Sequence, residues 1–240
     1  MPQPILKDKM KFGVVTFPGS NCDEDMVYVL EEILDQKVER LWHKDTDLKG
    51  VDFVILPGGF SYGDYLRSGA IAKLSPIMGE VITHANNGGY VLGVCNGFQI
   101  LTESGLLEGA LLHNDNQKFI CKNIHLKSVT ANSGITEGLD PNKAYKIPIA
   151  HGEGRYYASD ETIQKLNAND QILFKYCNEQ GEVSSAENPN GSIENIAGIC
   201  NEGRNVFGMM PHPERASDDE LANTDGKAMF MSILAHCQKN

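Results

Sequence analysis

A repeated local pattern constrains the fold more than any other feature of this sequence. Short apolar runs stop at glycine or proline, and helix-compatible residues follow them. The run over residues 11–17 stops at Pro18-Gly19, the run over 52–56 stops at Pro57-Gly58-Gly59, and a third run ends just before Cys95. Strands that alternate with helices in this way form mostly parallel sheets with both faces covered. Functional sites in such sheets gather beyond the carboxyl ends of the strands, so these three turns are the first places to search.

The first of these turns predicts a helix. Ser20 or Asn21 would cap the helix, because both residue types accept hydrogen bonds from first-turn amides and an acidic segment follows them. Its apolar face would comprise Met26, Leu30, Ile33 and Leu34. Residues 37–42 form another strand-like run.

The second half of the chain has a different pattern. Residues 118–129 and 146–150 are strand-like with no clear helix between them, and residues 192–199 and 205–210 follow a strong turn signal. We therefore expect an antiparallel extension of the sheet. A final helix is predicted over residues 225–237, with Met229, Phe230, Ile233 and Leu234 inward.

Bulk properties favour one soluble α/β domain. We assign residues 10–240 to a single domain and residues 1–9 to a loose N-terminal extension, because the first strand-like run begins at Lys11. The net charge of -11 and the lack of a basic cluster argue against nucleic-acid binding. No apolar run approaches the ~20 residues of a membrane helix, and no signal-peptide pattern is present. We expect a cytoplasmic protein.

The six cysteines predict reduced thiols, because the chain has neither the length nor the spacing of a disulfide-rich secreted domain. Cys121 and His125 would share one face of a strand, but two ligands alone do not make a metal site. We predict no metal.

Cys95 has the surroundings of a nucleophile. It lies where a strand meets a helix, with Gly93 and Gly97 two residues away on either side. A nucleophile elbow needs small residues at those two positions, because the sharp turn crowds them together. The positive end of the following helix favours the reactive thiolate, and the N–H of Asn96 could hold an oxyanion. The alternative is a buried cysteine in a glycine-rich turn.

His212 is the best candidate for the base that such a thiol needs. It follows a strand-like run, and Pro213 restricts its backbone to extended conformations. In an extended segment His212 and Glu214 project to the same side, so Glu214 could orient the imidazole. The alternative is a solvated proline-rich loop.

Other segments offer supporting groups. Gly58 and Gly59 follow a strand and could supply a second oxyanion donor, although a simple tight turn would also explain them. The polar loop with His151, Glu153 and Arg155 would face a substrate or a partner, or would be an ordinary surface loop. Cys22 also lies near a helix start, but it lacks flanking glycines, and the three acidic residues after it oppose thiolate formation. We therefore do not predict Cys22 as the nucleophile.

The combined motifs resemble the class I, or triad, glutamine amidotransferases. Cys95 in a GxCxG elbow with a distant His-Pro-Glu is typical of that superfamily. Five stretches, two of which contain these motifs, are similar to the glutaminase subunits of phosphoribosylformylglycinamidine synthases: VTFPGSNCDEDM, LPGGFSYGDYLRSGAIA, GVCNGFQIL, AHGEGRY and FGMMPHPER. The resemblance covers nearly the whole chain from Met10.

This resemblance implies a flavodoxin-like, three-layer fold and L-glutamine as the substrate. Cys95 would attack the side-chain amide, His212 would move the proton, and Glu214 would hold His212 in the correct tautomer. The N–H groups of Gly59 and Asn96 would bind the oxyanion. Gln99 would contact the amino-acid portion of the substrate, one helical turn from Cys95.

The resemblance also implies partners. The ammonia would pass to a synthetase subunit that makes formylglycinamidine ribonucleotide, and a small accessory subunit would help to assemble the complex. The chain has no GxxxxGK[ST] loop. We expect it to bind no cofactor, with ATP and Mg bound by the synthetase.

Two other classes of function are compatible with the sequence. The chain could be a glutaminase that serves another synthetase, or a stand-alone γ-glutamyl hydrolase. It could also be a thiol-based redox or stress protein on a similar fold, although the downstream His-Pro-Glu favours a glutaminase.

Overall fold

The computed structural model describes residues 9–239 and is built around one mixed sheet. Nine strands lie in the order β2-β1-β3-β4-β11-β10-β9-β6-β7. Their bounds are β1 Lys11–Thr16, β2 Lys37–Trp42, β3 Phe53–Leu56, β4 Tyr90–Val94, β6 Ile120–Ser128, β7 Ala144–His151, β9 Ile172–Cys177, β10 Ile196–Cys200 and β11 Val206–Met209. A small second sheet pairs β5 (Ala110–Leu112) with β8 (Arg155–Tyr157).

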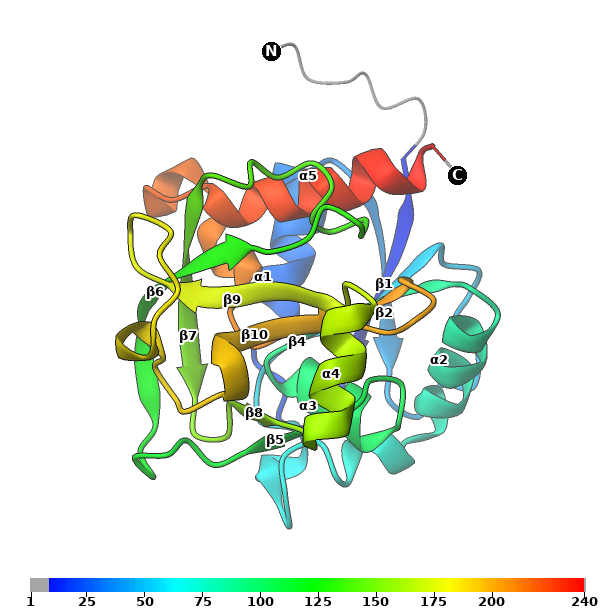
Figure 1. The fold of residues 1–240 in the computed structure, drawn as a ribbon. Helices are drawn as coiled ribbons and strands as arrows, with labels where there is room; N and C mark the ends of the chain where they lie inside the picture. Colours follow the sequence, from blue (N-terminus) through cyan, green and yellow to red (C-terminus); the bar gives the residue numbers. More distant parts are fainter. Residues whose placement is uncertain (1–8, 240) are drawn as a thin grey trace.

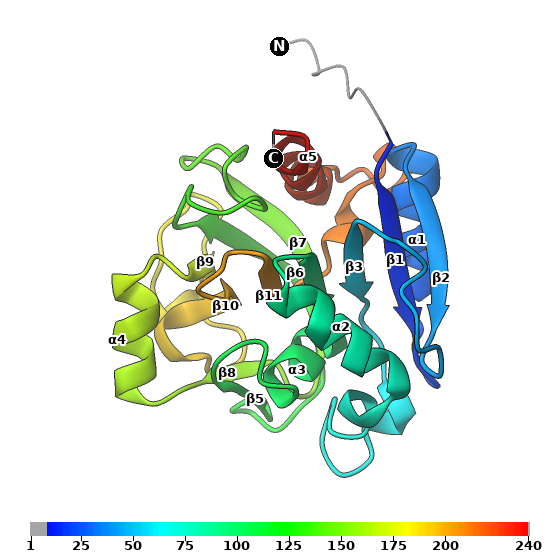
Figure 2. The ribbon, with the colours of Figure 1, turned by 90° about the vertical axis from the view of Figure 1, so that its right-hand side faces the viewer.

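Helices cover both faces of this sheet. Figures 1 and 2 show α1 and α5 on one side and α2, α3 and α4 on the other. Their bounds are α1 Asp23–Tyr28, α2 Pro76–Asn86, α3 Asn96–Glu103, α4 Asp160–Ala168 and α5 Asp225–Cys237. α3 packs against β3, β4 and β11 in the middle of the sheet, so the turn that precedes α3 lies at the sheet's centre.

The sheet divides into a parallel half and an antiparallel half. The neighbours from β2 to β11 are all parallel. From β11 through β10, β9 and β6 to β7 every pairing is antiparallel. The prediction of an antiparallel extension is confirmed, but the prediction of a mostly parallel sheet is wrong. The reason lies in the connections. Parallel neighbours need a long crossover, usually a helix, whereas the segments that join β6 to β7 and β10 to β11 contain no helix.

The local predictions succeed where the hydrophobic period is regular. β2 and α5 have the predicted bounds, and the four residues predicted to face inward from α5 are buried. The predicted caps Ser20 and Asn21 are wrong, because α1 begins one residue later with Cys22 at its N-cap. After Tyr28 the chain winds as a π-helix over Val29–Ile33. Because a π-helix has more residues per turn than an α-helix, the apolar face of the segment is rotated from its predicted position. Ile33 is therefore half-buried, and Val29 is buried instead.

Some elements were not predicted. The strand segment predicted over residues 192–199 begins as a 3₁₀ turn and becomes a strand only at Ile196. α2, α4 and β9 were also missed. The start of α4 did carry a signal, since Ser159 caps the helix by accepting a hydrogen bond from the Thr162 N–H, and Asp160 and Glu161 stand in its first turn.

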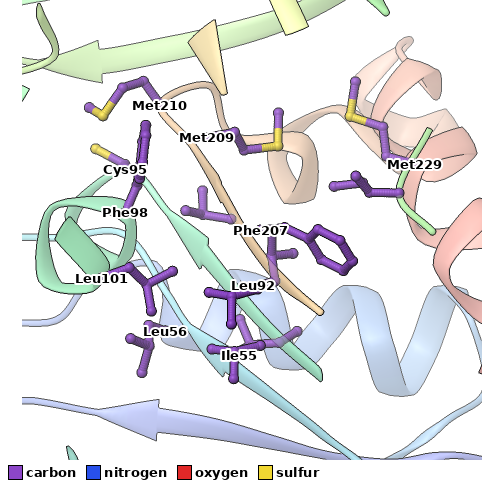
Figure 3. Close-up of a cluster of buried hydrophobic side chains, with 14 of the residues drawn as sticks. Ile55, Leu56, Leu92, Cys95, Phe98, Leu101, Phe207, Met209, Met210 and Met229 are labelled. Carbon is purple, nitrogen blue, oxygen red and sulfur yellow. The ribbon is translucent and has the colours of Figure 1, made fainter. Parts of the chain in front are cut away.

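The hydrophobic core lies directly beneath the Cys95 turn. Figure 3 shows Cys95 beside Phe98 and Met210, with Leu56, Leu92 and Leu101 below. All are buried, and Phe98 and Leu101 are completely inaccessible to solvent. The thiol is thus mounted directly on the buried core of the fold.

Two glycines allow α3 to approach the sheet closely. A Cβ atom on Gly97 would lie 1.8 Å from the Leu56 carbonyl oxygen, and one on Gly93 would lie 2.6 Å from the Gly97 carbonyl. Both distances are too short for any side chain. Helix α3 therefore rests with its backbone on the end of β3.

The domain assignment of residues 10–240 stays a prediction, and the extension assigned to residues 1–9 lies almost entirely outside the described residues. Within residues 9–239, none of the helices combines the length and the hydrophobicity that a membrane-spanning segment requires.

Replacing Gly97 should disturb the fold and the site together. For Gly97→Ala we expect a loss of about 1–3 kcal/mol in the free energy of unfolding, because the added methyl group overlaps the Leu56 carbonyl. Gly79→Ala, within α2, is the matched control, because a Cβ there meets nothing within 4 Å. This control should be stabilised by roughly 0.5–1 kcal/mol, the ordinary helix preference for alanine. Urea unfolding of both variants provides the measurement, and equal stability of the two would contradict this packing.

Candidate active site

Cys95 sits in a strained turn between β4 and α3. Its φ and ψ angles are 49° and −105°, outside the regions that L-residues ordinarily occupy. The surrounding backbone holds this conformation: the Cys95 N–H donates to the Met209 carbonyl at 2.8 Å, and the Gln99 N–H donates to the Cys95 carbonyl at 3.1 Å. The predicted elbow geometry is confirmed. Strain held in this way is typical of functional positions.

The Cys95 thiol borders a cavity of about 170 Å³. The cavity lies beyond the carboxyl end of β4, where ligands of α/β sheets bind. The thiol is 5% exposed, and its sulfur approaches the Ala150 carbonyl oxygen at 3.7 Å. The residues that line the cavity are Gly59, Phe60, Asp64, Ser68, Cys95, Gln99, His113, Phe119, Ala150, His151, Gly152 and Glu153.

His212 and Glu214 form a buried pair. Nδ1 of His212 lies 2.7 Å from Oε1 of Glu214, and the two residues are 1% and 2% exposed. The predicted pairing is confirmed, but its expected cause is wrong. The segment does not stay extended, because Pro213–Ala216 turns as a short 3₁₀ helix. The chain bends back after His212 and brings the carboxylate to the imidazole.

The electrostatics of this pair favour a charged imidazole. Burial opposes a charge on His212, but Glu214, Cys95 and Cys22 outweigh it and raise the pKa of His212 well above its ordinary value. Nε2 of His212 is buried without a hydrogen-bond partner. With Nδ1 held by Glu214, Nε2 is the atom left to exchange a proton with a thiol.

Cys22 lies beside this pair, which the sequence did not predict. The Cys22 sulfur, a His212 ring nitrogen and a Glu214 oxygen all lie within 4.8 Å of one another. Arg215 donates to the Cys22 sulfur at 3.2 Å and to Asp25 at 3.0 Å. Nearly the whole chain separates Cys22 from His212, so no local pattern could have indicated their contact.

Gly58 and Gly59 have different surroundings. A Cβ on Gly58 would lie 2.6 Å from Cε1 of His212, so this glycine makes room for the imidazole. Gly59 lines the cavity next to Cys95 and has a φ of 132°, which only glycine adopts readily. Gly59 and the first-turn amide of Asn96 therefore remain the candidate oxyanion donors.

The side chains of Asn96 and Gln99 are tied together next to the thiol. Nδ2 of Asn96 donates to Oε1 of Gln99 at 2.9 Å, and Nε2 of Gln99 donates to the Glu153 carbonyl at 2.6 Å. Gln99 thus links α3 to the loop that follows β7. Its predicted contact with substrate stays a prediction.

The loop from His151 to Arg155 contributes to two hollows. His151 and Glu153 line the Cys95 cavity, where Glu153 also contacts His113 at 3.3 Å and accepts from the Ser68 N–H at 3.3 Å. Arg155 lines a neighbouring hollow of about 310 Å³. The structure therefore places two of the three predicted loop residues beside the thiol.

His151 is held in one tautomer. Nδ2 of Asn114 donates to the backbone carbonyls of His151 and Lys118, which fixes the Asn114 amide. Oδ1 of Asn114 then faces Nδ1 of His151 at 3.0 Å, so Nδ1 must carry the proton. Burial, together with the charge of His212, lowers the pKa of His151 to about 4. His151 is therefore a neutral imidazole at neutral pH.

Asp64 is a cavity residue that the sequence reasoning missed. Burial, aided by the charge of Glu153, raises the pKa of Asp64 to about 6. Its carboxylate accepts from Nδ2 of Asn96 at 3.4 Å. A bound cation would favour its ionised form. The residue lies within the SYGDY motif, but a single aspartate in a loop gave no local signal.

The remaining cysteines lack comparable features. Burial raises the pKa of Cys177 and of Cys200 to about 11 and that of Cys237 to about 12, so these stay protonated thiols. Cys121 is exposed on β6. In the part of the chain that the structure describes, Cys121 and His125 join no group of three potential metal ligands.

Sequence comparisons relate the chain to one family. The model of the CobB/CobQ-like glutamine amidotransferase domain matches residues 9–231. The chain is similar to the phosphoribosylformylglycinamidine synthase subunit PurQ of Koribacter versatilis, with 54% identity over 96% of this chain and 100% of that protein. It is also similar to the PurQ subunits of Synechocystis, with 56% identity over 92% and 99% of the two chains, and of Aquifex aeolicus, with 52% over 94% and 100%.

Solved structures give the same relationship. A chain in the structure of PurLQS from Thermotoga maritima superposes with a TM-score of 0.82 at 42% identity, over 95% of this chain and 99% of that one. A glutamine amidotransferase from Thermotoga maritima has a TM-score of 0.61 at 15% identity, over 97% and 100%, and shows the likeness of the fold alone.

The buried, neutral His151 should make stability depend on pH. Its pKa in the folded chain is below the ~6.5 of an unfolded histidine, so protonation favours the unfolded state. The stabilisation is complete above about pH 6.5 and is lost as the pH falls toward 4. Between about pH 6.5 and 4.5 the free energy of unfolding of His151→Gln should therefore fall by about 2 kcal/mol less than that of the wild type.

Denaturant unfolding at the two pH values measures this difference. His125→Gln, at a half-buried position on β6, is the matched control and should keep the wild-type dependence. Equal pH dependence in all three proteins would show that His151 titrates normally.

Proposed function

Because the chain belongs to the family of glutamine amidotransferases with a CobB/CobQ-like domain, we propose that Cys95, His212 and Glu214 are the triad that hydrolyses L-glutamine. The observation that carries this proposal is the strained elbow of Cys95 together with a buried His212–Glu214 pair, which lies close enough for Cys95 to raise the pKa of His212. The chain is the glutaminase subunit of phosphoribosylformylglycinamidine synthase, an enzyme of purine biosynthesis.

The triad divides the reaction into two steps. His212 takes up the Cys95 thiol proton through Nε2, which gives a thiolate and an imidazolium, and the thiolate attacks the carboxamide carbon of glutamine. His212 then gives that proton to the departing ammonia, and a γ-glutamyl thioester remains on Cys95. Water activated by His212 cleaves the thioester and releases glutamate. Glu214 stabilises the imidazolium in both steps, in agreement with the raised pKa of His212.

The groups around the thiol have supporting roles in this proposal. The N–H groups of Gly59 and Asn96 bind the oxyanion of each tetrahedral intermediate. Gln99 positions the amino-acid portion of glutamine, and His151 and Glu153 border the same cavity. Asp64 adds a second carboxylate to the cavity, besides that of Glu153, and its negative charge would favour binding of the substrate's ammonium group.

The released ammonia has to reach an acceptor before water protonates it. The solved neighbour is described as PurLQS, so we assign to this chain a synthetase subunit and a small accessory subunit as partners. ATP and Mg would be bound by the synthetase, and this chain would bind no cofactor. Arg155, in the hollow next to the cavity, is proposed to face the substrate or one of these partners.

The wider predictions follow from the same assignment. The parallel strand order β2-β1-β3-β4-β11 supports a flavodoxin-like, three-layer arrangement extended by antiparallel strands. We assign residues 10–240 to one glutaminase domain and place the protein in the cytoplasm.

Cys95→Ser tests the nucleophile. Glutamine-dependent synthesis by the assembled complex should fall by at least about 10³-fold, because a hydroxyl is a far weaker nucleophile than a thiolate. Ammonia-dependent synthesis should stay within about twofold of wild type, because the acceptor chemistry lies on the synthetase. Cys121→Ser, at an exposed position, is the control. Retained glutamine-dependent synthesis in Cys95→Ser would overturn the assignment.

Glu214→Gln tests the charge of the triad. The amide can still accept from Nδ1 of His212, but it no longer stabilises the imidazolium. We expect glutaminase turnover to fall by about 10²-fold or more, yet by less than in Cys95→Ser. Glu179→Gln, at an exposed position, should match wild type. Glutaminase assays of both variants decide this, and an unchanged rate in Glu214→Gln would contradict the role of the carboxylate.

A further inference from the structure

The Cys22–His212–Glu214 cluster contains more ligand atoms than the glutaminase reaction uses. In the proposed reaction Glu214 acts through Oε1 on Nδ1 of His212. Its second oxygen, Oε2, is buried and has no hydrogen-bond partner. A buried carboxylate oxygen without a donor is costly, and the triad mechanism does not explain it. The Cys22 sulfur adds a third donor within 4.8 Å, and the reaction does not use it either.

The three donors match a metal of intermediate softness. One thiolate, one imidazole nitrogen and one carboxylate are ligands typical of Zn²⁺. Zinc bonds of about 2.3 Å to sulfur and about 2.0 Å to nitrogen or oxygen place ligand atoms roughly 3 to 4 Å apart. The cluster therefore needs only a small adjustment to surround an ion. The charges also balance, since a thiolate and a carboxylate together neutralise a divalent cation in a buried site.

The position of Glu214 determines which ring nitrogen of His212 would bind the metal. Because its carboxylate faces Nδ1, a metal that binds both His212 and Glu214 must occupy the place of the Nδ1 proton. Gly58 lies against the same edge of the ring, near Cε1 and Nδ1, and against the Cys22 sulfur. Arg215 contacts that sulfur at 3.2 Å and would move aside or remain beside the bound ion. A hollow of about 830 Å³ adjoins the cluster, because His212 and Arg215 are among the residues that line it.

We propose that Cys22, His212 and Glu214 form an inhibitory site for Zn²⁺ and similar divalent metals. Binding releases the proton of the Cys22 thiol and the Nδ1 proton of His212 to solvent, and the ion takes their place. The neutral imidazole then carries its remaining proton on Nε2. In that tautomer Nε2 cannot accept the proton of Cys95, so glutamine hydrolysis stops. The inhibition rests on the proposed function, whereas the binding does not.

Cobalt spectroscopy tests the binding without any enzymatic activity. In Cys95→Ala the nucleophilic sulfur is absent, so a thiolate-to-Co²⁺ absorption band must come from another cysteine. We expect this band at one Co²⁺ per chain. Adding Cys22→Ser should abolish it, whereas adding Cys121→Ser should leave it unchanged. Adding Glu214→Gln, a variant that tests a different ligand, should weaken Co²⁺ binding by about tenfold or more. Absence of the band in Cys95→Ala, or its survival without Cys22, would overturn the proposal.

Zinc titration tests the inhibition in the assembled complex. Each protein is compared with its own metal-free rate of glutamine hydrolysis. Cys22→Ser should raise the Zn²⁺ concentration for half-inhibition by about tenfold or more relative to wild type, and Cys121→Ser should not change it. Equal sensitivity of Cys22→Ser and wild type would show that zinc inhibits through Cys95 alone and would contradict an inhibitory role for the cluster.

Discussion

The site depends on a backbone-to-backbone contact beneath Cys95. Gly97 lies so close to the Leu56 carbonyl that even a methyl group would overlap it, and Gly93 is similarly pressed against Gly97. These contacts fix the first turn of α3 against the end of β3 and force Cys95 into its strained conformation. The strain is held by the central strands of the sheet and by a fully buried core. The thiol is therefore aimed by the scaffold.

The second constraint is the burial of an acid–base pair beside that thiol. His212 and Glu214 are almost inaccessible to solvent, so the charge on His212 depends on the nearby Glu214 carboxylate. This arrangement raises the pKa of His212, whereas the nearby His151 has its pKa lowered to about 4 and stays neutral. The two imidazoles thus have opposite charge states: the Glu214 carboxylate helps to keep His212 charged, whereas burial and the charge of His212 keep His151 neutral.

Local patterns in the sequence predicted the parts of the molecule that local physics decides. The period of the apolar residues was enough to predict the bounds of β2 and α5. The flanking glycines were enough to predict the elbow at Cys95. The His212–Glu214 pair followed from their spacing, although a 3₁₀ turn rather than an extended strand brings them together. The contact of Cys22 with Arg215 spans 193 positions, and the placement of Asp64 in the cavity depends on tertiary packing. The π-turn after Tyr28 and the equal division of the sheet likewise had no local signature.

The central claim is that Cys95, and not the equally buried Cys22 beside His212, is the sulfur that glutamine acylates. A diazoketone analogue of glutamine alkylates the thiol that attacks the substrate, and peptide mass spectrometry of the labelled complex locates the adduct. We predict one adduct per chain, on the peptide with Cys95, and we predict that excess glutamine prevents it. An adduct on Cys22, or labelling that glutamine does not suppress, would contradict the account.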